Sequence, residues 1–71
     1  MKFDMSVSDN FASFQDVENG KYIFIDSFDN ETFEVRVGTI EDSEQVGSVT
    51  ASSDDELNTK LMQLYKSHIG G

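Results

Sequence analysis

The sequence predicts a small α+β fold in which an antiparallel sheet of three to four strands packs against a short helix and a C-terminal helix. Two patterns in the 71 residues lead to this prediction. Apolar residues alternate with polar ones in several segments, as in a half-buried strand, and near the C-terminus they recur at the three- and four-residue spacing of a helix. Short polar turns separate the segments, so we expect one compact domain spanning residues 1–71.

The N-terminal part is predicted to form one strand and one short helix. Residues 2–7 place an apolar side chain at every second position, which is typical of a strand. Phe11, Phe14 and Val17 then recur at every third position, after a group of capping side chains and before an Asn-Gly pair. This spacing predicts a helix over residues 9–18, although an ordered loop anchored by the two phenylalanines would give the same pattern.

The middle of the chain is predicted to form three antiparallel strands. Residues 21–28 and 32–40 are apolar-rich segments joined by Asp29-Asn30, and these two residues favour a tight turn. The pair is the clearest hairpin in the sequence. Residues 45–51 form a weaker strand, in which Gly47 lowers the strand preference and indicates a bulge.

The C-terminal helix is predicted over residues 54–68. Ser53 and Glu56 have the spacing of a capping box, in which each side chain accepts a hydrogen bond from the other residue's backbone N–H. Acidic residues fill the first turn and basic residues lie further along, as the helix dipole favours. The helix face expected to be buried consists of Leu57, Leu61, Leu64, Tyr65 and His68.

The composition argues against a catalytic or metal-binding protein. The chain has no Cys and one His, His68, so disulfides are excluded and a zinc site lacks ligands. No nucleophile, base and orienting group recur at a recognisable spacing, and the clustered turn carboxylates lack the pattern of a calcium loop. We therefore expect no cofactor, no metal and no catalysis. No apolar run is long enough for a signal peptide or a membrane span, so we expect a cytoplasmic protein without membrane contact.

Charge is the most informative property of the sequence. Fourteen acidic residues face five basic ones, a net charge of −9. Residues 3–59 contain all fourteen acids and only two bases, Lys21 and Arg36, a net charge of −12 for that stretch. Such a chain repels nucleic acid and anionic lipid and attracts basic surfaces, so direct nucleic-acid binding is disfavoured.

The sequence leaves two interpretations of the acids open. In one they only keep a small domain soluble. In the other they stand in for phosphates and engage a basic surface of a partner protein, such as a nucleic-acid-binding enzyme. Small acidic inhibitors of such enzymes, many of them phage-encoded, resemble this chain in size and charge. The acids assigned to partner binding are Asp26, Asp29, Glu31, Glu34, Glu41, Asp42 and Glu44.

A second candidate surface is apolar. Residues 22–25 are all apolar, so this strand has two apolar faces, and the C-terminal helix covers only one of them. Either Tyr22 and Phe24 or Ile23 and Ile25 therefore point to the opposite face. The other face is covered either by Phe11 and Phe14 of the predicted short helix or by a partner or second copy of the chain. The alternative function is therefore self-association as a homodimer, with Tyr22 and Phe24 assigned to the interface.

Overall fold

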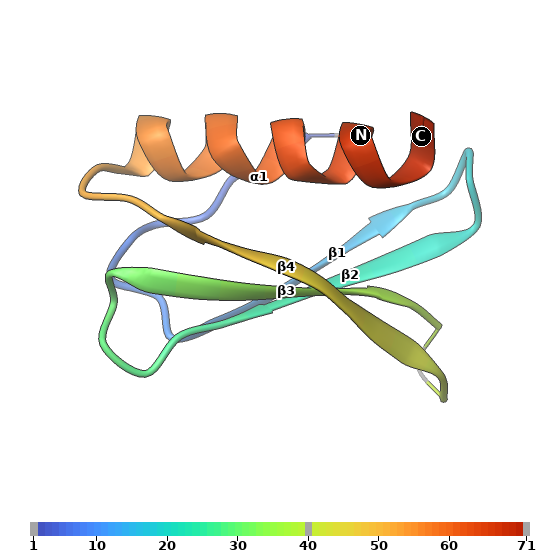
Figure 1. Cartoon of the computed structure of the whole chain (residues 1–71), viewed down its shortest axis with the longest axis horizontal. Helices are drawn as coiled ribbons and strands as arrows, with labels where there is room; N and C mark the ends of the chain where they lie inside the picture. The colour runs from blue at the N-terminus through green and yellow to red at the C-terminus, as the bar shows by residue number, and fades with distance from the viewer. Residues whose placement is uncertain (1, 40, 71) are drawn as a thin grey trace.

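Four strands and one helix form the fold in the computed structural model, which describes residues 2–39 and 41–70. The elements are β1 (Phe11–Asp16), β2 (Lys21–Asp26), β3 (Thr32–Gly38), β4 (Ser43–Thr50) and α1 (Asp54–Gly70) (Figure 1). The strands form one antiparallel sheet in the order β1-β2-β3-β4, and α1 follows as the one helix of the described residues. The predicted α+β class and the C-terminal helix packed on an antiparallel sheet are confirmed.

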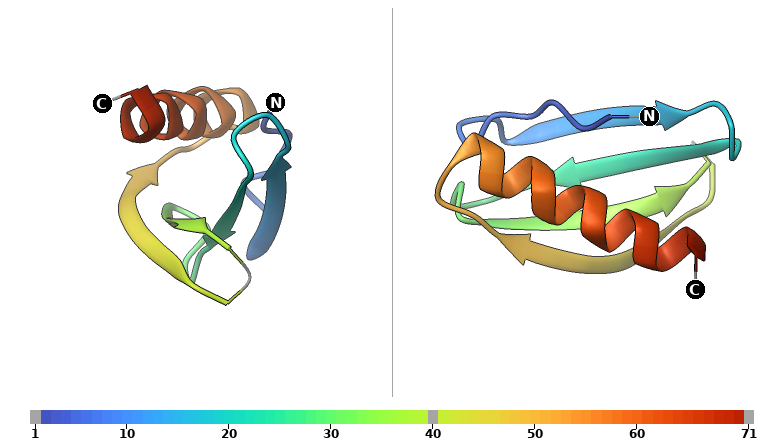
Figure 2. Two further views of the ribbon diagram at one scale, coloured as in Figure 1. Left: turned by 90° about the vertical axis from the view of Figure 1, so that its right-hand side faces the viewer. Right: turned by 90° about the horizontal axis from the view of Figure 1, so that it is seen from above.

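One face of the sheet is covered and the other is not. Helix α1 and the segment before β1 lie together on the same side of the sheet, with α1 above β3 and β4 and the N-terminal segment nearer β1 (Figure 2). No element of the described chain lies on the opposite side (Figure 1). Helix and sheet therefore share one hydrophobic core, and its residues are Phe3, Met5, Ile23, Ile25, Phe33, Val35, Val37, Ala51, Leu57, Leu61 and Tyr65.

The predicted strand over residues 2–7 is wrong, although its buried positions are correct. Phe3 and Met5 are buried, but the segment pairs with no strand. Side chains of α1 satisfy its backbone instead: Asn58 accepts from the Met5 N–H at 2.8 Å and donates to the Met5 carbonyl at 2.9 Å, and Asp54 accepts from the Val7 N–H at 2.9 Å. Period-two burial thus arises here without a ladder of strand hydrogen bonds.

The predicted short helix over residues 9–18 is also wrong, because this segment forms β1. The hairpin to β2 turns through Val17–Gly20, so the Asn-Gly pair that suggested a helix end forms a strand turn, with Gly20 at a φ of 65°. The inward-facing residues of β1 are Ala12, Phe14 and Asp16. Because Ala12 is small and Asp16 is charged, this inward row does not show the apolar–polar alternation from which a strand is predicted.

The other strands agree with the sequence except at their ends. The β2–β3 hairpin and the strand β4 are where the pattern predicts them, but β2 ends at Asp26 and leaves Phe28 in the loop. The last residue of the predicted segment 32–40 lies outside the described residues. A bulge inserts one extra residue into β4 just before Gly47, whose Cα faces the Leu64 side chain, as the glycine suggested.

Helix α1 is two residues longer than predicted and has a modified cap. The Ser53 hydroxyl accepts from the Glu56 N–H at 3.2 Å as expected, but the Glu56 carboxylate accepts from the Ser52 N–H at 2.7 Å rather than from Ser53. Of the predicted buried face, Leu57, Leu61 and Tyr65 are fully buried, Leu64 is partly buried and His68 is exposed. Among the described residues, no helix has the length and hydropathy to cross a membrane.

Candidate interaction surface

The side of the sheet that α1 and the N-terminal segment leave uncovered is the candidate interaction surface, and we call it the outer face. Strand register places on it every second residue of β1, β2 and β3 and their partners in β4. The central row runs from Ser13 through Phe24 and Arg36 to Gln45. The residues of the outer face are Phe11, Ser13, Gln15, Tyr22, Phe24, Asp26, Thr32, Glu34, Arg36, Gly38, Ser43, Gln45, Ser48 and Thr50.

Two aromatic rings occupy the centre of the outer face. Tyr22 and Phe24 stack with ring centroids 6.3 Å apart and planes 10° from parallel, and both side chains are half-buried. The isoleucines that alternate with them, Ile23 and Ile25, are fully buried beneath α1. The sequence left open which of these two pairs faces away from the helix, and the register assigns Tyr22 and Phe24 to that side. The short helix expected to cover them is absent from the described chain.

One ion pair and one further carboxylate flank the rings. Arg36 donates to one oxygen of Asp26 at 2.6 Å, and the other oxygen of Asp26 is buried with no hydrogen-bond donor among the described atoms. Glu34 lies in the next row, where the Gln45 amide donates to it at 3.5 Å. The outer face therefore combines aromatic area, in which interface centres are enriched, with acidic groups that attract a basic surface.

The seven acids assigned to partner binding do not form one patch. The structure separates them into three groups: Asp26 and Glu34 on the outer face, Asp29 and Glu31 in the β2–β3 loop at one end of the sheet, and Glu41, Asp42 and Glu44 in and after the β3–β4 turn at the other end. A single basic surface of modest size can therefore contact one end of the sheet together with the outer face, but not both ends closely.

Asp29 has a structural role in the β2–β3 loop. Its carboxylate accepts hydrogen bonds from the Thr32 N–H at 2.8 Å and the Glu31 N–H at 2.9 Å. These two bonds, that of Thr32 more strongly, hold the Asp29 pKa below its usual range. The next residue, Asn30, adopts a left-handed conformation with φ of 58° and donates to the Val7 carbonyl at 2.9 Å. This loop is a fixed turn that also anchors the N-terminal segment, so Asp29 is engaged by its own chain.

At the opposite end, the acids lie beside basic groups. Asp42 and Glu44 line a shallow hollow of about 260 Å³ together with Lys21 and His68. Gly38 lies in the same hollow, where a Cβ atom would stand 2.3 Å from the Asp42 carbonyl oxygen, so the turn needs glycine there. The positive charge of Lys21 offsets part of the negative charge that this end offers a partner.

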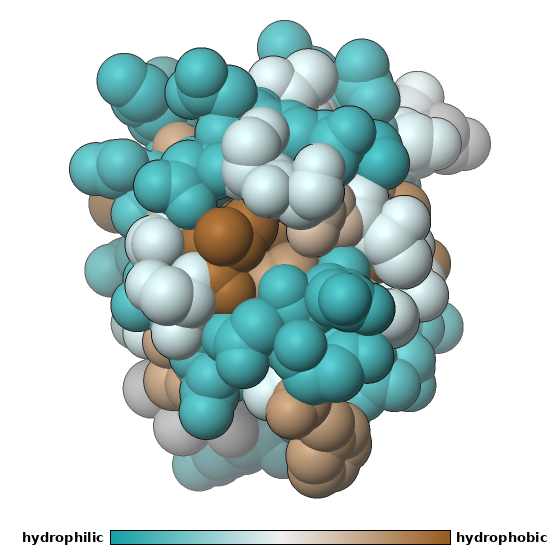
Figure 3. Space-filling model, turned by 90° about the vertical axis from the view of Figure 1, so that its left-hand side faces the viewer, coloured by the Kyte–Doolittle hydropathy of each residue, from teal (hydrophilic) through white to brown (hydrophobic). Residues whose placement is uncertain are grey.

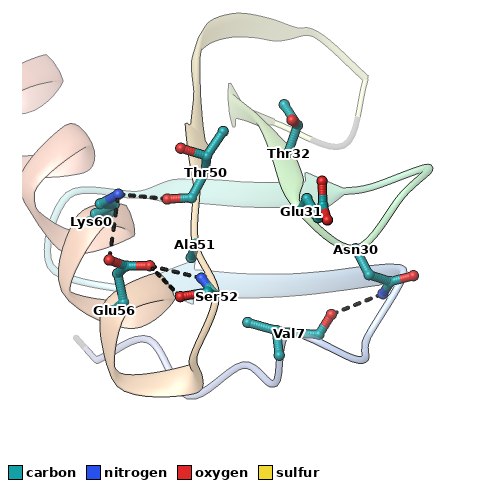
Figure 4. Close-up of a pocket in the computed structure, with 9 residues that line it drawn as sticks. All are labelled: Val7, Asn30, Glu31, Thr32, Thr50, Ala51, Ser52, Glu56 and Lys60. Carbon is teal, nitrogen blue, oxygen red and sulfur yellow. Dashed lines mark hydrogen bonds and ion pairs between the residues drawn. The ribbon is translucent and has the colours of Figure 1, made fainter.

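A larger hollow of about 610 Å³ opens at the end of the molecule that holds the β2–β3 loop. Figure 3 shows an apolar patch in the middle of this end, surrounded by hydrophilic side chains, and the apolar residues lining the hollow are Val7 and Ala51. Most of its polar groups already bind one another: Lys60 donates to the Thr50 carbonyl at 2.6 Å and lies 3.9 Å from Glu56 (Figure 4). These bonds link α1 to the end of β4. The hollow therefore does not present the convergent free groups of an active site.

Glu56 connects the helix cap with this hollow. The Ser52 N–H, and after it the charge of Lys60, hold the pKa of the Glu56 carboxyl below its usual range. Within residues 2–39 and 41–70, no three His, Cys, Asp or Glu side chains lie close enough to hold a metal ion.

Asp16 is a buried acid that sequence reasoning missed. It lies on the inner side of β1, and its carboxylate accepts from the Tyr65 hydroxyl at 2.6 Å and the Asn19 amide at 2.7 Å. The hydrogen bond from Tyr65, and to a smaller extent that from Asn19, holds the Asp16 pKa below its usual range. The pKa of Tyr65 is raised, mainly by burial of its hydroxyl and further by its hydrogen bond to Asp16. The bond joins β1 to α1 within the core. An acid directly before a hairpin turn gave no signal of this role.

The Asp16–Tyr65 bond makes stability depend on pH. Because the Asp16 pKa is lower in the folded than in the unfolded chain, its contribution is present above the unfolded pKa and is lost as pH falls through the folded one. We expect Tyr65→Phe to lower the midpoint of urea unfolding at neutral pH and to reduce the further loss on acidification. Urea unfolding of both proteins across the acidic range measures this, and parallel pH curves would contradict the assignment.

Comparison with protein families, curated proteins and solved structures finds no match to this chain. Its function therefore has to be argued from its own surface.

Proposed function

We propose that this chain is a non-catalytic protein-interaction module, a small inhibitor or regulator whose acids engage a basic, nucleic-acid-binding surface of a partner protein. The observation that carries the proposal is unneutralised charge. The chain has a net charge of −9, and in the described structure only two of its bases, Arg36 and Lys60, form ion pairs with acids. A compact scaffold that holds so many exposed carboxylates attracts basic surfaces over a distance of about a Debye length, ~8–10 Å at ordinary salt.

Two of the seven acids assigned to partner binding already make bonds within the chain. Asp26 is paired with Arg36 and Asp29 is held in its turn, so their carboxylates already serve the fold. Each of the three groups nevertheless keeps a glutamate for which the described structure gives no ion pair, and these are Glu31, Glu34 and Glu41. Of the assigned acids they are the ones whose removal disturbs the fold least, because Glu31 and Glu41 are exposed and Glu34 makes one long hydrogen bond to Gln45.

The test is a pull-down from cell lysate with the immobilised chain, washed at low and then at moderate salt. We expect retention of a nucleic-acid-binding protein that elutes as salt rises, because screening weakens exposed charge pairs. The triple variant Glu31→Gln/Glu34→Gln/Glu41→Gln is expected to lose most of that retention.

A matched control separates these positions from net charge alone. Asp4→Asn/Glu18→Gln/Asp55→Asn removes the same number of negative charges elsewhere, at three exposed positions. We expect it to weaken retention less than the triple glutamate variant. Equal retention by all three proteins, or retention that ignores salt, would contradict the proposal.

Self-association through the outer face is the second candidate function, and one observation favours it: no described element covers Tyr22 and Phe24. Each copy carries −9, so two copies repel, and raising salt should strengthen the dimer. Binding to a basic partner has the opposite salt dependence. Sedimentation at high protein concentration, at low and high salt, distinguishes the two, and a monomer under every condition would exclude self-association.

A further inference from the structure

The outer face carries aromatic side chains that the fold does not bury. Phe11 faces outward beside Asp26 and is 60% exposed, whereas Phe28 is 99% exposed and lines a small hollow with Thr32 and Glu34. Folding leaves both phenylalanine side chains in contact with water, so a partner that covered them would gain the hydrophobic burial that the fold itself does not make. Phe11 and the stacked rings of Tyr22 and Phe24 thus give the outer face of a strongly charged protein aromatic area, and Phe28 adds an exposed ring in the β2–β3 loop next to Glu34.

Aromatic area distinguishes the outer face from the other acidic places on the molecule. The β3–β4 end has acids beside Lys21 and His68, and the large hollow at the other end is lined by polar groups bonded to one another. Stable protein interfaces contain an apolar, often aromatic centre with a polar rim. Among the described surfaces, the outer face has that composition, with the stacked Tyr22 and Phe24 on it and Glu34 in the row next to that of Phe24.

We propose that the basic partner docks on the outer face, an inference that rests on the proposed function. Arginine or lysine side chains of the partner would lie over the Tyr22–Phe24 pair and reach Glu34. A cation placed on an aromatic face is attracted to the ring, most strongly when a planar guanidinium stacks on it. Glu34 lies in the strand row next to that of Phe24 and is not in an ion pair in the described structure. Ring and carboxylate can therefore contact one cationic side chain together.

Charge complementarity selects a basic partner over a second copy. The outer face has two acids, Asp26 and Glu34, against one base, Arg36, and the whole chain carries −9. A second copy would bring the same sign of charge to the same surface, whereas a basic surface gains attraction at every acid around the face.

The experiment titrates a short oligo-arginine peptide into the isotope-labelled full chain at low salt and follows backbone amide shifts. We expect saturable shifts centred on β2 and β3 around Tyr22, Phe24 and Glu34. The charge-neutral variant Tyr22→Thr/Phe24→Thr is expected to bind the peptide roughly 5- to 30-fold more weakly, because each ring contributes about 0.5–1 kcal/mol to a stacked cation.

Two controls keep this test decisive. Val17→Thr/Ile69→Thr removes two exposed apolar side chains away from the outer face and is expected to leave the affinity unchanged. Circular dichroism checks that each variant is folded, and the shift map of the unaltered chain tests the site even if the ring variant unfolds.

The outcomes separate the docking surface from the proposed function. Peptide binding with shifts confined to the two ends of the sheet, and an affinity indifferent to the ring variant, would overturn the docking surface and leave the acidic interaction standing. No peptide binding at low salt would overturn both. Outer-face shifts that follow protein concentration without peptide would assign the surface to a second copy.

Discussion

Phe33→Ala is expected to leave the chain largely unfolded at room temperature. Phe33 lies in β3 with no exposed surface, at the centre of the single core that α1, the sheet and the N-terminal segment share. Truncating a buried phenylalanine costs about 3–5 kcal/mol, and a core in a domain of this size rarely supplies more than about 3–5 kcal/mol of net stability. Far-ultraviolet circular dichroism and urea unfolding measure the loss directly.

The matched control for this prediction is Phe28→Ala. It makes the same chemical change at a residue that is 99% exposed, so we expect the unfolding midpoint to stay close to that of the unaltered chain. If the two alanine variants lost the same stability, the placement of Phe33 in the core and of Phe28 outside it would be wrong.

Asn58→Ala is expected to lower the free energy of unfolding by about 2 kcal/mol or more. The Asn58 side chain makes both hydrogen bonds of the Met5 backbone, and its loss leaves a donor and an acceptor unpaired next to the core. Each such group costs about 1–3 kcal/mol when it is buried without a partner. Urea unfolding gives the change, and hydrogen exchange at the Met5 amide shows whether the N-terminal segment has detached.

Gln63→Ala controls for the change of an amide side chain on the same helix. The Gln63 side chain is exposed and makes no hydrogen bond in the described structure, so its replacement should change stability by no more than about 0.5 kcal/mol. Equal effects at the two positions would show that α1 does not hold the N-terminal segment through Asn58.

The middle and the end of the chain were predictable because their local patterns agree with their tertiary roles. Strand β2 is a continuous apolar run and β3 alternates, with an Asp-Asn turn between them, and α1 has a cap followed by a spaced leucine row. The N-terminal part was not predictable because its backbone is satisfied by side chains from residues about fifty positions away, such as Asn58. The inward Asp16 likewise needs Tyr65, which no window around residue 16 contains.

The candidate surface was predictable in composition but not in arrangement. The sequence identifies the acids. It also shows that the second apolar face of this strand consists either of Tyr22 and Phe24 or of Ile23 and Ile25. The choice of Tyr22 and Phe24 depends on strand register, because a one-residue slip would exchange them for Ile23 and Ile25. Similarly, Asp29 and Glu31 look alike in sequence, and only the geometry of the loop shows that Asp29 caps the turn.

The salt dependence of affinity for the captured partner tests the central claim most directly. Titration of the purified partner at increasing salt, with the unaltered chain and with Glu31→Gln/Glu34→Gln/Glu41→Gln, gives the slope of affinity against ionic strength for each protein. If acids engage a basic surface, the affinity of the unaltered chain falls steeply as salt rises, and the variant shows a weaker affinity with a shallower slope. An affinity that stays constant or rises with salt in both proteins would contradict the claim.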